Sequence, residues 1–135
     1  MKSLRTEPRC GVVLLGISGT RPSRKTSAIE NEGLNYTMHA PEIAASRWFN
    51  TPDALTLEKL RGRPVFIHAF QMLCPGCAMH GTPQAERAHR MFKNSDLQVI
   101  GLHTVFEHHA AMSPVSLEAF IHEYRVTFPI AVDEP

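Results

Sequence analysis

The chain has 135 residues, of which 43% are hydrophobic and 20% charged, and its formal net charge at neutral pH is +1. This length and apolar share suit one domain with a packed core. A net charge so close to zero gives no electrostatic sign of a nucleic acid or an anionic membrane as a partner. No stretch of the sequence approaches the ~20 consecutive apolar residues that a membrane span needs.

The first 37 residues differ in composition from the rest of the chain. They hold six Lys/Arg against three acidic residues, whereas residues 38–135 hold eight against ten and contain all eight histidines. The apolar stretch Cys10–Gly19 is short, and a poor cleavage region follows it, so a secretory signal is not favoured. We interpret residues 1–37 as a leader outside the fold, disordered or not native, and residues 38–135 as the domain, with Met38 as a hypothetical native start. We expect a cytoplasmic location and leave a periplasmic one open.

Three segments are expected between residues 40 and 70. "APEIAASRWF" (Ala40–Phe49) predicts a short helix. "TPDALTLEKLRG" (Thr51–Gly62) predicts a turn and then one helical turn, which Thr56 can cap and Gly62 can end. "PVFIHAF" (Pro64–Phe70) is a short apolar run rich in Val, Ile and Phe, and we interpret it as a buried, central, parallel strand.

A helix and a second strand follow. Pro75 suits the first position of a helix, where a missing N–H costs nothing, and this helix is expected to run to about Phe92. Pro83 lies inside it and should kink it. "LQVIGLH" (Leu97–His103) then predicts a second buried strand.

The last part of the chain predicts one more helix and one more strand. Ser113 and Pro114 open the helix, and its apolar face is made of Leu117, Phe120, Ile121 and Tyr124. "FPIAVD" (Phe128–Asp133) begins a third strand. Strands that alternate with helices in this way imply a parallel sheet with right-handed crossovers and therefore an α/β fold class.

Two cysteines, Cys74 and Cys77, stand where the first predicted strand gives way to a helix. Cys74 lies at the helix N-terminus, where unpaired N–H groups and the helix dipole favour a thiolate, the reacting form of cysteine. Cys77 lies one turn inward, close enough to form a disulfide with Cys74, and should be more buried. The expected chemistry is attack by Cys74 on a disulfide of a protein partner, followed by resolution through Cys77. Cys10 stands alone in the leader, and three cysteines cannot form a disulfide framework.

A metal site is the alternative use of the same cysteines. Cys74, Cys77 and His80 form a C-x2-C-x2-H pattern, and a fourth zinc ligand could come from His103, His108 or His109. Structural zinc sites usually bring a second tight ligand pair, which this spacing does not offer. A single CxxC at a strand-to-helix turn favours redox chemistry, which needs no metal or other cofactor.

The stretch "WFNTPDALTLEKLRGRPVFIHAFQMLCPGC" (Trp48–Cys77) resembles the opening of thioredoxin-like redoxin domains. These include the TlpA-type thiol-disulfide oxidoreductases and the peroxiredoxin-like (AhpC/TSA-like) relatives. "VIGLHTVFEHH", the helix after it and "FPIAVD" resemble the next strand, inserted helix and strand of that family, so the likeness covers Trp48–Pro135. It implies a thioredoxin-like, three-layer α/β/α fold, with Cys74 as the nucleophile, Cys77 as the resolving cysteine, and a protein disulfide or dithiol as the partner.

The sequence departs from this family at two positions near the cysteines. The family often places a buried acid six residues before the first cysteine, and His68 stands there. His68 is either a base for the second cysteine or a core histidine hydrogen-bonded to the backbone, and both interpretations stay open. The family's helix-kinking proline usually lies five residues after the second cysteine, whereas Pro83 lies six after it, which predicts a reshaped helix start.

Two further departures concern activity. Peroxiredoxins place a threonine three residues before the reactive cysteine, and here that position is Gln71, so peroxide reduction by Cys74 is the less favoured alternative. The family's cis-proline loop and last strands come after the segment that "FPIAVD" matches. We therefore expect a thioredoxin-like fold that is incomplete at its C-terminus.

Overall fold

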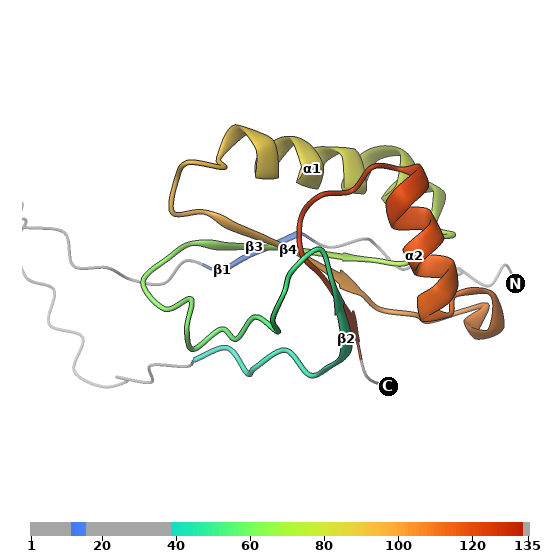
Figure 1. Cartoon of the computed structure of the whole chain (residues 1–135), viewed down its shortest axis with the longest axis horizontal. Coiled ribbons are helices and arrows are strands. Elements are labelled where there is room, and N and C mark those ends of the chain that lie inside the picture. Colours follow the sequence, from blue (N-terminus) through green and yellow to red (C-terminus); the bar gives the residue numbers. More distant parts are fainter. Residues whose placement is uncertain (1–11, 16–38, 134–135) are drawn as a thin grey trace, which may run out of the picture.

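The computed structural model describes residues 12–15 and 39–133, which form one five-stranded sheet with helices packed against it (Figure 1). The strand order across the sheet is β1-β3-β4-β5-β2. The strands are β1 (Val12–Leu15), β2 (Ala45–Phe49), β3 (Val65–Phe70), β4 (Gln98–His103) and β5 (Ile130–Asp133).

The three central strands are parallel, as the sequence predicts. In β3 and β4, His68 lies opposite Gly101 and Phe70 lies opposite His103. In β4 and β5, Gly101 lies opposite Ile130. These strands are apolar on both faces because both faces are covered, and this accounts for their nearly continuous hydrophobic runs.

The expected helix over Ala40–Phe49 is wrong, since this region contains strand β2. Residues Ala45–Phe49 pair antiparallel with β5, Trp48 opposite Ala131 and Phe49 opposite Ile130. Trp48 packs against the cluster on one face of the sheet and Phe49 against the cluster on the other. Pairing with a strand more than 80 residues away in sequence has therefore overridden the local helical pattern.

The segment expected to lie outside the fold contributes four residues to the sheet. Val12–Leu15 form strand β1, which pairs antiparallel with β3 so that Val12 lies opposite His68 and Leu15 opposite Val65. The backbone groups along this edge of β3 thus have partners, which an uncovered edge would lack. The expectation for residues 1–37 is wrong for these four residues, and the remainder of the leader, with Cys10, lies outside the described residues.

The helices are η1 (Cys77–Gly81, a π-helix), α1 (Thr82–Met91), η2 (His109–Ala111, a 3-10 helix) and α2 (Pro114–Glu123). The predicted start of α2 is confirmed, because the Ser113 hydroxyl accepts a hydrogen bond from the Ser116 N–H at 3.2 Å. Leu117 and Ile121 of its apolar face are buried, whereas Tyr124 is exposed and stacks on Phe120 with 4.3 Å between ring centroids.

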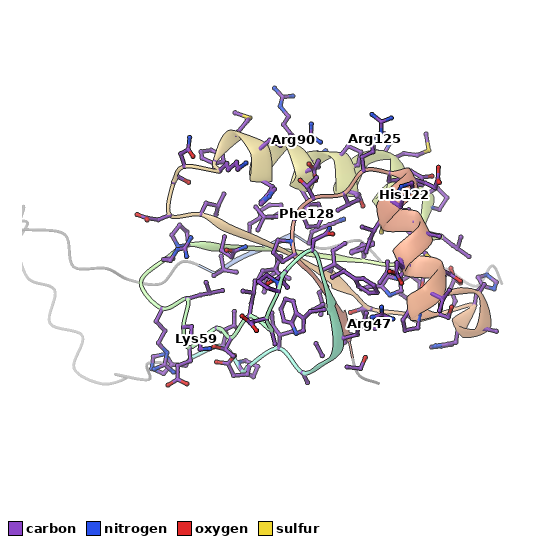
Figure 2. The ribbon with its side chains drawn as sticks, in the orientation of Figure 1. Arg47, Lys59, Arg90, His122, Arg125 and Phe128 are labelled. Atoms are coloured by element: carbon purple, nitrogen blue, oxygen red, sulfur yellow. The ribbon has the colours of Figure 1, made fainter. Side chains whose placement is uncertain are left out.

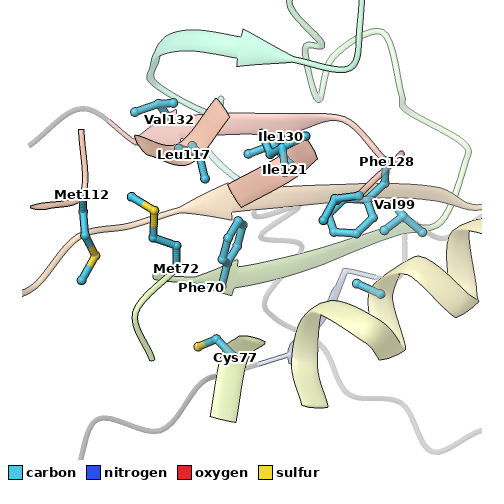
Figure 3. Packing of buried hydrophobic residues seen from close by; sticks show 12 residues of the cluster. Phe70, Met72, Cys77, Val99, Met112, Leu117, Ile121, Phe128, Ile130 and Val132 are labelled. Atoms are coloured by element: carbon cyan, nitrogen blue, oxygen red, sulfur yellow. The ribbon is translucent and has the colours of Figure 1, made fainter. Parts of the chain in front are cut away.

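Both α1 and α2 pack on one face of the sheet, and the segments before and after β2, residues 39–44 and 50–64, cover the other (Figure 1). The larger cluster lies under the helices, and Figure 3 shows Phe70, Cys77, Leu117 and Phe128 within it. Phe128 is fully buried between α1 and the sheet. The smaller cluster consists of Leu60, Val65 and Ile100 with the residues packed against them. The third layer of this α/β fold is therefore non-helical in the part of the chain that the structure describes.

The predicted turn before β3 is confirmed in its details. The Thr56 hydroxyl accepts a hydrogen bond from the Lys59 N–H at 3.3 Å, and Gly62 has a φ of +86°, the left-handed conformation that favours glycine at such an end. The Glu42 carboxylate adds two bonds of 2.7 Å, from the N–H groups of Leu57 and Glu58. Among residues 12–15 and 39–133, no helix is long and apolar enough to cross a membrane.

Candidate active site

Cys74 lies at the N-terminus of a helix that starts directly after the Gln71–Leu73 turn at the end of β3. Its N–H donates to the carbonyl of Gln71 at 3.1 Å, and its own carbonyl accepts from the N–H of Ala78 at 2.9 Å. The side chain is half-buried and the thiol is free, so it is not joined to Cys77 in this structure. The unpaired N–H groups and the dipole of a helix N-terminus favour negative charge.

Cys77 occupies the inner side of the same helical turn. It is only 1% exposed and belongs to the larger core cluster. Figure 3 shows its side chain on the sheet side of the helix, facing Phe70 and Met72. The prediction that Cys77 is more buried than Cys74 is confirmed. The pair thus combines a half-buried free thiol with a deeply buried cysteine.

The helix that carries the cysteines continues, after Pro75 and Gly76, as a π-helical segment, Cys77–Gly81. The N–H of Thr82 donates to the carbonyl of Cys77, five residues back instead of four. A π turn accommodates one extra residue, and Pro83 comes one residue later here than in the family that the sequence resembles. The predicted reshaping of the helix start is therefore confirmed, and its form is a π segment that ends just before Pro83.

His68 lies on β3 under this π segment, and it is 2% exposed. Its Nε2 is 3.2 Å from the hydroxyl of Thr82, and its ring stacks on Phe70 with centroids 5.1 Å apart. Burial lowers the pKa of His68 from 6.5 to about 4, so the ring is neutral near pH 7. Of the two interpretations of His68, the core role has direct support, although the partner is a side chain and not the backbone.

A second buried histidine, His103, also contacts the ring of Phe70. It is 1% exposed, and its ring meets the Phe70 ring edge-on with centroids 5.4 Å apart. Within the described residues, neither of its ring nitrogens has a hydrogen-bond partner. Burial lowers the pKa of His103 to about 4 as well, so this ring too is neutral near pH 7.

Gln71 is a site residue whose structural role the sequence did not reveal. Its side chain is completely buried, and its amide oxygen accepts from the N–H groups of Phe106 and Glu107 at 3.2 and 3.4 Å. Its amide nitrogen donates to Glu107 Oε1 at 3.3 Å. The sequence pointed to position 71 only because the threonine typical of peroxiredoxins is absent there. Its hydrogen-bond partners lie 35 and 36 positions further along the chain, so no local sequence pattern indicates them.

The metal alternative receives no support from the geometry. Among residues 12–15 and 39–133, no group of three or more His, Cys, Asp or Glu side chains is arranged to hold a metal ion. The set built on Cys74, Cys77 and His80 with one of the later histidines is therefore not assembled. His103 in particular is buried beside Phe70, and His108 and His109 lie on an exposed loop.

Comparisons with known proteins agree with this geometry. The family model described as the AhpC/TSA family matches residues 38–135. A thioredoxin-like superfamily protein of known structure is 56% identical with a TM-score of 0.70, over 73% of this chain and 64% of its own. A thiol-disulfide isomerase from Corynebacterium glutamicum is 52% identical with a TM-score of 0.66, over 70% of this chain and 61% of its own. A thioredoxin-like protein in the oxidized form is 26% identical with a TM-score of 0.56, over 66% of this chain and 57% of its own.

These comparisons confirm the thioredoxin-like fold that the sequence resemblance implied. The chain spans 64% and 61% of the lengths of the first two proteins, so the likeness covers part of each. No curated protein sequence matches the chain at a significant level.

Proposed function

The chain belongs to the AhpC/TSA family of thioredoxin-like redoxins, and from this premise we propose that Cys74 and Cys77 exchange disulfides with a protein partner. The observation that carries the proposal is the pairing of a half-buried free thiol at a helix N-terminus with a buried cysteine one turn inward. The likeness to a thiol-disulfide isomerase at 52% identity supports it. Membership of the family by itself supports an oxidoreductase activity; the couple and the partner are our proposal.

The exchange takes place in two steps. The Cys74 thiolate attacks one sulfur of the partner's disulfide, which forms a mixed disulfide and releases the other sulfur as a thiolate. The Cys77 thiolate then attacks Cys74, which closes the Cys74–Cys77 disulfide and releases the second partner thiolate. Two electrons pass to the partner, whose two thiolates take up protons from water. The reverse sequence oxidises a partner dithiol, and an external dithiol would restore the reduced couple.

His68 enters this proposal as a positioning residue and not as the base. Its hydrogen bond to the Thr82 hydroxyl fixes the residue whose N–H binds the carbonyl of Cys77. A histidine whose pKa lies at about 4 is a weak proton acceptor at neutral pH, which disfavours a base role. The contact with Thr82 instead holds the turn that carries Cys77.

Trapping of the mixed disulfide tests the proposal. A Cys77→Ser variant should form a covalent complex with a disulfide-containing protein such as insulin, because the second step is blocked. Dithiothreitol should reduce the mixed disulfide and separate the two proteins. Cys74→Ser should form none. Cys10→Ser is the matched control, and it should reduce insulin as the parent does. Reduction of insulin by Cys74→Ser at the parent rate would overturn the assignment.

Peroxide reduction is the second candidate, and family membership is the observation that favours it. In that reaction the Cys74 thiolate takes the terminal oxygen of a hydroperoxide and releases an alcohol. Cys77 then displaces water from the sulfenic acid to form the disulfide. The Gln71 side chain at the position of the peroxiredoxin threonine is fully engaged by Phe106 and Glu107, which disfavours a contact with peroxide. Consumption of hydrogen peroxide, measured beside insulin reduction at the same dithiothreitol concentration, separates the two candidates.

A further inference from the structure

We propose that Gln71 is a positioning residue that holds the loop of residues 104–108 beside Cys74, so that this loop contacts the partner polypeptide next to its disulfide. The inference rests on the proposed disulfide exchange and names a determinant of partner binding within it. Its basis is a set of hydrogen bonds that join one residue to two separate parts of the site, through its backbone carbonyl to Cys74 and through its side-chain amide to Phe106 and Glu107.

The first part is the cysteine turn itself. Gln71 is the residue that follows β3, and its carbonyl accepts from the N–H of Cys74 at 3.1 Å. Any displacement of the Gln71 backbone therefore moves the reactive residue. The side chain of Gln71 is completely buried. Burial of an amide costs free energy unless its polar atoms form hydrogen bonds.

The second part is the loop between β4 and η2. Its first residue, Thr104, continues the sheet by donating its N–H to the carbonyl of Phe70 at 2.9 Å. Beyond it, within the part of the chain that the structure describes, the hydrogen bonds of Phe106 and Glu107 all go to the Gln71 side chain. Hydrogen bonds to the side-chain amide of Gln71 therefore hold this loop in place, where the backbone forms no helix or strand.

Two large apolar side chains are exposed in the parts that Gln71 joins, one in the cysteine turn and one in the loop. Leu73, next to Cys74, is 55% exposed, and Phe106 is 47% exposed. The Glu107 carboxylate in the same loop is held by the amide nitrogen of Gln71. Large apolar side chains that are exposed in the free protein gain free energy when a partner covers them, and aromatic residues often carry much of the binding energy. The occupant we infer is a polypeptide segment with an apolar residue adjacent to its disulfide cysteine.

Loss of the Gln71 amide should therefore weaken partner binding without altering the chemistry of Cys74. In Gln71→Leu the N–H groups of Phe106 and Glu107 lose their acceptor, so the loop is released. The KM for insulin should rise about tenfold, the factor that corresponds to about 1.4 kcal/mol of binding free energy. The kcat for insulin, the alkylation rate of Cys74 with iodoacetamide and the rate with the small disulfide 5,5′-dithiobis(2-nitrobenzoate) should each stay within about twofold.

Other variants keep the test decisive if Gln71→Leu does not fold. Phe106→Ala removes the exposed ring and leaves the hydrogen bonds of its backbone in place, and it should raise the KM for insulin in the same way. Met91→Ala is the matched control, because Met91 is 65% exposed but lies at the far end of α1 from the cysteines. It should leave the KM unchanged.

A double variant tests the hydrogen-bond pairing itself. Gln71→Glu places a carboxylate against that of Glu107 and should raise the KM. Adding Glu107→Gln restores a donor–acceptor pair and should return the KM toward that of the parent, which a purely structural role of Gln71 would not predict.

The outcomes separate this inference from the function on which it rests. A parent protein that neither reduces insulin nor forms a mixed disulfide with it overturns the proposed function, and this inference falls with it. A parent that reduces insulin, with an unchanged KM in Phe106→Ala and in folded Gln71→Leu, overturns the role of Gln71 alone. Equal losses with insulin and the small disulfide would also overturn it, because they indicate damage to Cys74.

Discussion

The imidazole of His68 fills the space that a side chain at Gly81 would need. A Cβ atom at position 81 would lie 2.5 Å from His68 Cε1 and 3.3 Å from Nε2. Gly81 is the last residue of the π segment, and the neighbouring Thr82 is the hydrogen-bond partner of His68. The glycine, the histidine and the π turn therefore depend on one another, and this mutual fit holds the inner cysteine turn against β3.

This fit predicts that Gly81→Ala destabilises the domain. The added methyl group must displace a buried ring from its place beside Phe70, and overpacking of this kind costs about 1–3 kcal/mol of unfolding free energy. Chemical denaturation followed by circular dichroism measures the loss. In a His68→Ala background the clash is absent, so the same glycine substitution should cost much less there. Equal costs in both backgrounds would contradict the proposed contact.

The two buried histidines predict a loss of stability at mildly acidic pH. Burial lowers the folded-state pKa of both His68 and His103 from 6.5 to about 4. Between pH 6.5 and 4 the unfolded chain therefore binds protons that the folded chain does not, so the unfolding free energy should fall as the pH falls through this window. Above about pH 7 both states are neutral at these rings and the contribution should be flat. Denaturation midpoints from pH 8 to 4 check this.

Replacement of each histidine by leucine should separate their roles. His68→Leu leaves the Thr82 hydroxyl without its buried partner and should cost about 1–3 kcal/mol at pH 7. His103→Leu removes two ring nitrogens that have no partner among the described residues, and it should cost little or even stabilise the domain. Both variants should show a shallower loss of stability between pH 6.5 and 4. A large cost of His103→Leu at pH 7 would show that its nitrogens make a favourable interaction.

Strands β3 and β4 were predictable because each is a short and mainly apolar run. The observed bounds of β3 and β4 lie within one residue of the predicted ones at every end. Cys74 and Cys77 were equally accessible to sequence reasoning, because a helix N-terminus directly after a strand is a local feature. The start of α2 was fixed by local signals as well, namely a capping serine and a proline at the first position.

The features that sequence reasoning missed depend on distant partners. Ala45–Phe49 forms a strand by pairing with β5, and no local sequence pattern indicates this pairing. Gln71 is important only because Phe106 and Glu107 return to it from 35 and 36 positions away. The place of the π segment was indicated by the position of Pro83, but its contact with His68 required the three-dimensional structure.

Glu86 joins α1 to the segment before β5, and this link should matter for stability. Its carboxylate accepts from the N–H of Thr127 at 2.8 Å and from the hydroxyl at 2.7 Å, and Arg90 on the same helix pairs with it at 2.6 Å. Figure 2 shows Arg90 on the outer side of α1. Burial acts to raise the pKa of Glu86, but the bonds from Thr127 and Arg90 outweigh it and leave the pKa below its usual value.

A Glu86→Gln variant should therefore be less stable near neutral pH by about 1–2 kcal/mol, with the two Thr127 bonds weakened and the ion pair lost. Because the folded-state pKa is lowered, the contribution of the carboxylate is present above the unfolded-state pKa and is lost as the pH falls through the folded-state value. Parent and variant should thus converge in acid. Arg90→Gln is the matched control; its arginine is largely exposed, so this change should cost less.

The helix N-terminus at Cys74 predicts how nearby charges change the reactivity of its thiol. Gly76 has a helical φ of −63°, and a Cβ built there meets no atom within 4 Å, so longer side chains fit at this position. A lysine at position 76 would bring a positive charge to the first turn of the helix that Cys74 opens, and a glutamate would bring a negative one. At pH 7 and low salt, alkylation of Cys74 by iodoacetamide should therefore follow the order Gly76→Lys, Gly76→Gln, Gly76→Glu, with steps of about two- to fivefold.

Peptide mass mapping after short labelling times measures each cysteine separately. Cys77, which is 1% exposed, should label at least about tenfold more slowly than Cys74 in the folded, reduced protein. Raising the salt concentration to about 1 M should compress the differences among the three Gly76 variants, because ions screen an interaction between exposed charges. If the alkylation rate of Cys74 changes neither with the charge at position 76 nor with salt, the electrostatic environment of the helix N-terminus does not control the reactivity of this thiol. Its proposed role as the attacking group would then lose its physical basis.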